Sequence, residues 1–246
     1  MRLRARGVTV RYRAVTAVDG VDLDAAPGEV LALLGANGSG KSSLMRALAG
    51  VTKHGGSVAW EGGGAVGYMP QDNASSAALT AFEVVLLGRL RSLSLRAGAA
   101  ELAAAEAALG ELGILHLAQR QLGTLSGGQR QLVFLAQVLA GEPRALLLDE
   151  PTSALDIAHQ LQVLSMVREA AARRGLTTIV VLHDINAAAR FADRIALLRQ
   201  GRLVMTGTPA AALCAEALRD AYAVDVAVGP GPDARLVVVP VRPVAA

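Results

Sequence analysis

The sequence of 246 residues is long enough for one α/β domain, and its 52% of hydrophobic residues can fill a large core. It has no apolar run near the roughly 18 residues that a membrane-spanning helix needs. Its single cysteine, Cys214, excludes an internal disulfide and fits a reducing cytosol. The formal net charge of +3 is spread along the chain without a basic tract, so nucleic acid is not expected as a partner.

The first part of the chain has the alternation of a β-rich region. Residues 1–6 alternate charged and apolar side chains like an edge strand, and they lack the apolar centre of a signal peptide. Residues 17–24 alternate again, and the Asp19-Gly20 pair within them predicts a turn. The apolar run 30–34 predicts a short buried strand.

A glycine-rich loop follows this strand directly. Residues 35–42 read Gly-Ala-Asn-Gly-Ser-Gly-Lys-Ser, which matches the phosphate-binding loop in its spacing of glycines, lysine and hydroxyl residue, and a helix is predicted over 43–50. Strand, loop and helix in this order aim backbone N–H groups at a polyphosphate. Lys41 would reach the outer phosphates, and Ser42 would ligate Mg²⁺. A chance glycine-rich turn is the alternative, which the flanking strand and helix disfavour.

The middle of the chain changes from strand to helix. Short strands are expected at 55–60 and 65–69, and the sequence then becomes alanine-rich and helical over 79–141. Three helices are expected there. The first starts at the capping box of Thr80 with Glu83, the second covers residues 99–112, and the third runs from Ser126 to Ala140.

Strands and helices alternate again after residue 141, which predicts a mainly parallel sheet covered by helices on both faces. The expected strands are 145–148, 177–182, 194–198 and 202–205, and the expected helices are 157–173, 185–191 and 209–219. We therefore expect a single α/β domain over 1–246: a core with an N-terminal β subdomain in 1–75 and 141–223, an inserted helical subdomain in 76–140, and a tail with strand-like segments in 224–246.

A second candidate anion site lies at the start of the helix that Ser126 caps. Residues 125–129 read Leu-Ser-Gly-Gly-Gln, and two glycines beside a helix N-terminus let an anion approach the backbone. One nucleotide needs only one phosphate cradle. A second copy of the chain, docked head to tail, would let each copy complete the other's site; the alternative is a plain capped turn.

Three further polar positions follow predicted strands. Asp149 and Glu150 come after the apolar run 145–148, where carboxylates can hold Mg²⁺ and polarise an attacking water. Gln71 follows the strand 65–69 and can contact a metal-bound water, and His183 follows 177–182 and can reach a terminal phosphate. A solvated acidic turn, an ordinary loop glutamine and a structural histidine are the respective alternatives.

The ordered set of motifs resembles the nucleotide-binding subunit of ABC transporters over about residues 2–215. The similar segments are Walker A at 35–42, the Q-loop at Gln71, the signature at 125–129, Walker B at 146–150, the D-loop at 153–156 and the switch histidine at His183. Tyr12 stands where the family has the aromatic A-loop residue that stacks on adenine; a buried strand tyrosine is the alternative. Ser43 stands where threonine is usual and keeps the hydroxyl.

The resemblance implies the ABC ATPase fold and an ATP site that uses Mg²⁺. One copy would bind ATP through Tyr12, Gly35, Ala36, Asn37, Gly38, Ser39, Gly40, Lys41, Ser42 and Ser43, and the second copy through Ser126, Gly127, Gly128, Gln129 and Asp156. The resemblance assigns Mg²⁺ to Ser42, Gln71 and Asp149, and catalysis to Glu150, His183 and Gln71.

It also implies an ATPase subunit at the cytoplasmic face of the cell membrane. The partners would be a second copy of the chain, transmembrane permease subunits and, indirectly, a substrate-binding protein. One alternative is a soluble ABC ATPase that acts on nucleic acid or ribosomes, although such proteins usually carry long coiled coils or two fused ATPase domains. Another is a small-molecule phosphotransferase, in which residues 125–129 have no role.

Two segments, 79–89 and 157–161, resemble the importer branch that takes up iron–siderophore complexes, haem and cobalamin. We therefore expect a ferric siderophore first, with haem or cobalamin next. Residues 71–89 would meet the coupling helix of the permease, and Val84, Val85 and Leu87 could supply an apolar groove for it. The alternative is that these three are core residues of the helical subdomain.

Overall fold

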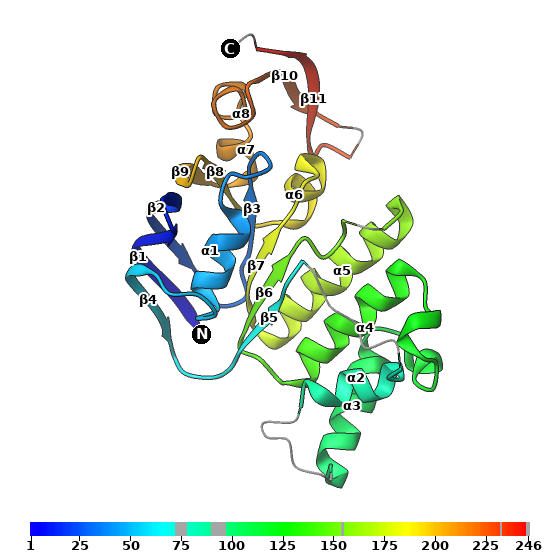
Figure 1. Ribbon diagram of the computed structural model, residues 1–246. Helices are drawn as coiled ribbons and strands as arrows, with labels where there is room; N and C mark the ends of the chain where they lie inside the picture. Colours follow the sequence, from blue (N-terminus) through cyan, green and yellow to red (C-terminus); the bar gives the residue numbers. More distant parts are fainter. Residues whose placement is uncertain (72–77, 90–96, 154, 232, 245–246) are drawn as a thin grey trace.

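The computed structural model describes residues 1–71, 78–89, 97–153, 155–231 and 233–244. Its main sheet has six strands in the order β5-β6-β7-β3-β8-β9, all parallel to their neighbours except the antiparallel pair β8 and β9 (Figure 1). The strands are β3 (Val30–Leu34), β5 (Val66–Met69), β6 (Ala145–Asp149), β7 (Thr177–Val181), β8 (Arg194–Arg199) and β9 (Arg202–Gly207). The predicted parallel sheet is confirmed.

Two hydrophobic cores lie on opposite faces of this sheet. Along β3, Leu31 and Leu33 belong to one core, and Ala32 and Leu34 belong to the other, as the pleat of a strand requires. The first core is closed by α1 (Lys41–Leu48) and the small antiparallel sheet. The second core is closed by helices that include α5 (Ile157–Arg174) and α6 (Ile185–Phe191). In the described part of the chain, no helix combines the length and the apolar character that crossing a bilayer requires.

The small sheet corrects two expectations. Its order is β2-β1-β4, formed by β1 (Arg2–Tyr12), β2 (Val15–Ala25) and β4 (Gly55–Glu61), so the N-terminal strand is central and not at an edge. Its alternation instead reflects one buried face. The Asp19-Gly20 pair is also not a turn, because it lies within β2. Both residues oppose Thr9 in a bulge, which the positive φ of Gly20 permits.

The segment between β5 and β6 is helical, as predicted. Its helices are α2 (Ala81–Leu87), α3 (Ala99–Glu111) and α4 (Gly127–Ala140), and both capping boxes are present, Thr80 with Glu83 and Ser126 with Gln129. Val84 and Val85 are only 4% and 0% exposed within the second core, so the expectation that they line a groove is wrong and the core alternative holds for them. Leu87 is exposed.

The C-terminal region corrects one further boundary. The helix expected over 209–219 is broken into α7 (Pro209–Ala212) and α8 (Ala215–Tyr222), because Cys214 is extended between them and both pieces bury apolar side chains. The tail forms a hairpin of β10 (Val224–Pro230) and β11 (Leu236–Pro243). The expected division into a core, a helical subdomain and a tail stays a prediction, and its boundary between residues 75 and 76 lies outside the described residues.

One close contact within the helical segment can be tested by mutation. A Cβ atom at Gly88, which ends α2, would lie 1.9 Å from the carbonyl oxygen of Gln137 in α4. We expect Gly88→Ala to lower the free energy of unfolding by about 1–3 kcal/mol, because the two helices must separate. The control is Gly110→Ala in α3, where a Cβ atom meets open space. This substitution should raise the free energy of unfolding by roughly 0.5–1 kcal/mol, because alanine favours a helix more than glycine does. Calorimetric melting of both variants measures this, and equal melting temperatures would contradict it.

Candidate functional site

At two glycines of the loop between β3 and α1, the backbone of another strand lies so close that a side chain is excluded. Gly35 has a φ of 151°, and a Cβ atom there would lie 2.1 Å from the carbonyl oxygen of Leu198. Gly40 has a φ of 103°, and its Cβ atom would lie 2.2 Å from the carbonyl oxygen of Ala17. Only glycine fits both positions. The loop is thereby held against β8 and β2 at the carboxyl end of β3.

The ammonium of Lys41 is buried inside this loop. Lys41 is 5% exposed, and its Nζ donates to the carbonyl oxygens of Gly35 at 2.8 Å and Ala36 at 3.1 Å. Burial lowers the pKa of Lys41, whereas the neighbouring carboxylates of Glu150 and Asp149 raise it. An anion that enters the loop can take the place of the two carbonyl oxygens as the partner of this ammonium.

Two side-chain oxygen groups of the kind that divalent cations prefer meet beside the loop. Asp149, the last residue of β6, is 1% exposed, and one of its carboxylate oxygens accepts a hydrogen bond from Ser42 Oγ at 3.2 Å. Burial raises the pKa of Asp149, and the Ser42 hydrogen bond opposes that rise. Hydroxyl and carboxylate oxygens are the donor atoms that Mg²⁺ prefers, so the pair fits this ion.

Glu150 joins two residues that are distant in the sequence. Its Oε2 accepts from Gln71 Nε2 at 2.9 Å, and its Oε1 lies 2.7 Å from His183 Nε2. Glu150 has a φ of 55°, which is uncommon for a non-glycine residue and often marks a functional position. The structure thus brings together all three residues that the sequence nominated for catalysis.

These groups surround one cavity of about 390 Å³. Its lining holds residues of the phosphate loop together with the carboxylate, amide and histidine, namely Ala17, Asn37, Gly38, Ser39, Gly40, Lys41, Ser42, Ser43, Gln71, Glu150 and His183. A volume of this order suits a ligand of small-molecule size. Ala17 is the one lining residue that the sequence motifs did not nominate.

Tyr12 lies next to this cavity at the end of β1. Its side chain is 42% exposed, so the alternative of a buried strand tyrosine is wrong. A hydrogen bond with the Ser43 hydroxyl lowers the pKa of Tyr12, which places the ring beside the first turn of α1. An exposed aromatic ring at the rim of the cavity offers a stacking surface.

The second candidate anion site lies elsewhere in the chain. Ser126 caps α4, and its Oγ accepts from the backbone N–H of Gln129 at 3.3 Å. Gly128 is packed so closely on α5 that a Cβ atom would lie 3.3 Å from side-chain atoms of both His159 and Leu155. Asp156 caps α5 by accepting from the backbone N–H of His159 at 2.9 Å.

The structure does not bring these residues to the phosphate loop of the same chain. None of residues 126–129 and 156 lines the 390 Å³ cavity. The helices α1 and α4 pack into cores on opposite faces of the main sheet, and Figure 1 shows them on opposite sides of it. The two candidate anion sites of one chain are therefore separate in space.

Sequence reasoning also missed a side chain in α8 that forms a hydrogen bond with the phosphate loop. The N–H of Gly35 donates to the hydroxyl oxygen of Tyr222 in α8 at 2.9 Å. The two residues are 187 positions apart, and no motif surrounds Tyr222 in the sequence. Only the folded structure reveals this contact.

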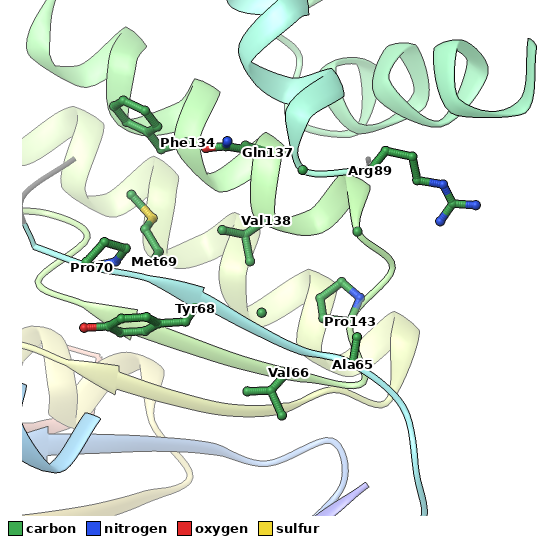
Figure 2. A pocket seen from close by; sticks show the side chains of 13 residues that line it. Ala65, Val66, Tyr68, Met69, Pro70, Arg89, Phe134, Gln137, Val138 and Pro143 are labelled. Carbon is green, nitrogen blue, oxygen red and sulfur yellow. The ribbon is translucent and has the colours of Figure 1, made fainter. Parts of the chain in front are cut away.

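A second cavity of about 400 Å³ lies between the edge strand β5 and the helices α2 and α4 (Figure 2). Its lining combines apolar side chains with polar groups, and Figure 2 shows Met69, Phe134 and Val138 on one side of β5 and Tyr68 on the other. Arg89 is at its rim and forms an ion pair with Glu142 at 2.9 Å.

The family model described as ABC transporter matches residues 18–153, which is more than half of the chain. This chain belongs to the ABC transporter family. The hemin import ATP-binding protein HmuV of Myxococcus xanthus is 42% identical over 94% of this chain and 96% of its own length. The protein of the same name from Gloeobacter violaceus is 39% identical over 84% of this chain and 82% of its own length.

Solved structures agree with this membership. A chain of a metal-chelate type ABC transporter in an inward-facing conformation is 30% identical, with a TM-score of 0.88 over 97% of this chain and 96% of that one. A dimeric ATP-binding cassette bound to ADP and Pi is 27% identical, with a TM-score of 0.76 over 84% of this chain and 98% of that one. The expected ABC ATPase fold, with its parallel sheet and antiparallel β subdomain, is confirmed.

Proposed function

We propose that this chain is the ATP-hydrolysing subunit of a membrane importer for an iron complex. The observation that carries the proposal is the single cavity in which the phosphate loop meets Gln71, Glu150 and His183. Relatives named as hemin import proteins support haem as the cargo, ahead of the ferric siderophore that the sequence placed first.

The residues of the cavity have distinct tasks in this proposal. The backbone of residues 35–43 and the ammonium of Lys41 bind the phosphates of ATP, and Tyr12 stacks on adenine. Ser42 and Asp149 hold Mg²⁺, with Gln71 acting through a bound water. When bound, the ion neutralises negative charge that develops during phosphoryl transfer.

Glu150 orients the attacking water and accepts its proton, while His183 contacts the terminal phosphate. In the described structure both oxygens of Glu150 are engaged, one by Gln71 and one by His183. Gln71 and His183 must therefore release at least one oxygen of Glu150 when ATP and water bind, so that Glu150 can act as a base. This requirement couples the position of Gln71 to the presence of the phosphate.

We propose further that two copies of the chain form the complete site. The N–H groups at the start of α4 and the dipole of that helix suit an anion, but they lie away from the phosphate loop of the same chain. In a head-to-tail dimer, residues 126–129 and Asp156 of each copy close over ATP held by the other. The similar ATP-binding cassette that is dimeric and bound to ADP and Pi supports the association of two copies.

The permease docks on the cavity beside β5 in this proposal. The cavity adjoins Gln71 through Met69 and Pro70, so an inserted helix could act on the residue that contacts Glu150. Phe134 and Val138 in α4 offer this helix apolar contact surface. The subunit would then lie on the cytoplasmic face of the membrane, and a substrate-binding protein would affect it only through the permease.

The shared site predicts complementation between two inactive variants. Lys41→Ala should lose ATP affinity in the isolated chain, whereas Ser126→Arg should retain ATP binding and lose hydrolysis, because Ser126 acts on the other copy's nucleotide. Mixing the two proteins should restore part of the ATPase rate, since a mixed dimer has one intact site. The ATPase rate is measured as phosphate release from each protein and from the mixture. The control is Lys41→Ala alone at twice its concentration, which matches the total protein in the mixture. Equal loss of ATP binding by both isolated variants would contradict the head-to-tail site.

The cargo is tested by uptake in cells that lack this subunit and any redundant one. We expect uptake of labelled haem to fall to background and to be restored by the wild-type chain or by Gly110→Ala, which is remote from the site. Lys41→Ala should not restore it. Normal uptake of haem, ferric siderophore and cobalamin would refute the importer assignment, and loss of cobalamin uptake alone would refute the iron complex.

A further inference from the structure

Gly35 is the residue at which the phosphate loop leaves β3, and both of its backbone polar groups are engaged. Its carbonyl oxygen accepts from Lys41 Nζ at 2.8 Å, and its N–H donates to the hydroxyl oxygen of Tyr222 at 2.9 Å. The two contacts differ in what ATP would do to them. Phosphates that attract the ammonium would remove the first contact, whereas Tyr222 would keep the second.

The position of Tyr222 is determined by contacts of the C-terminal part of α8. Leu218 and Ala221 of that helix are 1% and 4% exposed, and Asp220 forms an ion pair with Arg199 at the end of β8. The same strand provides the Leu198 carbonyl oxygen that leaves no room for a side chain at Gly35. Tyr222 and strand β8 therefore both fix the position of Gly35.

The tail hairpin connects this contact to the other side of the cavity. After Tyr222 the chain enters β10, and the carbonyl oxygen of Ala223 accepts from the N–H of Val244 after β11 at 2.8 Å. Val238 of β11 exchanges two hydrogen bonds with the side chain of Asn186, at 2.8 and 3.2 Å. Asn186 lies in α6, whose cap residue directly follows His183. The C-terminal segment thus joins α8, which contacts Gly35 through Tyr222, to α6, which begins just after His183.

From this geometry we infer that Tyr222 is a positioning residue of the ATP site, and that the C-terminal segment sets nucleotide affinity through its contact with Gly35. The inference rests on the proposed function, because it requires that the loop bind ATP. Tyr222 is not among the residues that line the 390 Å³ cavity, and it acts by holding the loop entrance in its binding conformation. Burial raises the pKa of Tyr222 to about 12, and the hydrogen bond from the N–H of Gly35 opposes that rise.

The test compares two single substitutions in the same helix of the full chain. Tyr222→Phe keeps the ring and removes the acceptor, which leaves the N–H of Gly35 without its partner. We expect its Kd for ATP with Mg²⁺ to rise about tenfold, with kcat at saturating ATP close to that of the wild type. Leu218→Ala loosens the packing of α8 but keeps the hydroxyl. It should lower the melting temperature more than Tyr222→Phe does and leave the Kd near the wild-type value.

Each outcome decides the inference. A rise in Kd for Tyr222→Phe alone supports the positioning role. An unchanged Kd, a fall in kcat without a change in Kd, or an equal rise in both variants overturns it, because the contact would then be neutral, catalytic in effect or merely part of general packing. Failure of the wild-type chain to bind ATP, with Lys41→Ala no different, refutes the proposed function itself. The two failures are therefore distinguishable.

Discussion

The buried ammonium of Lys41 is the constraint on which the rest of the site depends. An isolated charge in a protein interior is unfavourable by several kcal/mol, so the fold must provide partners for it. Two loop carbonyl oxygens and the nearby carboxylates of Asp149 and Glu150 do so. This requires that β3 and β6 end at the same edge of one parallel sheet, which the strand order places two positions apart with β7 between them.

The same constraint explains why the loop is held so tightly. Carbonyl oxygens can face the ammonium only if the chain turns sharply after β3, and the turn requires positive φ at Gly35, Gly38 and Gly40. Backbone atoms of Leu198 and Ala17 then approach closer than any side chain would allow. Strand β8, strand β2 and helix α8 thus act on the phosphate loop, although none of them belongs to a nucleotide motif.

The sequence predicted those parts of the fold that depend on local patterns. The strands of the main sheet, the capping box of Thr80 with Glu83, the N-cap at Ser126 and the residues of the cavity other than Ala17 were predicted, because each has a period, a cap or a fixed spacing. Alternation along residues 1–6 revealed a buried face but not the number of neighbouring strands, so β1 was taken for an edge. Asp19 and Gly20 form a bulge because β1 pairs with β2 on either side of them, Val8 with Val21 and Val10 with Val18. This register depends on both strands, so the sequence around Asp19-Gly20 alone could not predict it.

Other features depend on contacts between distant segments and left no local signal. Val84 and Val85 belong to the core because α3 and α4 cover them, which periodicity in a short helix cannot reveal. The contact between Tyr222 and Gly35 joins residues 187 positions apart. The separation of α1 from α4 across the sheet likewise emerges only from the fold. Because the two candidate anion sites of one chain lie apart, we propose a site shared between two copies.

The most direct test of that shared site is the association state of Glu150→Gln with ATP and Mg²⁺, measured by analytical ultracentrifugation alongside phosphate release. The amide cannot accept the proton of the attacking water, so ATP should stay intact and hold two copies together. The account predicts a dimer that contains one ATP per chain, dissociates when ATP is removed, and turns over at least about 100-fold more slowly than the wild type. A monomer saturated with ATP, or hydrolysis near the wild-type rate, would contradict it.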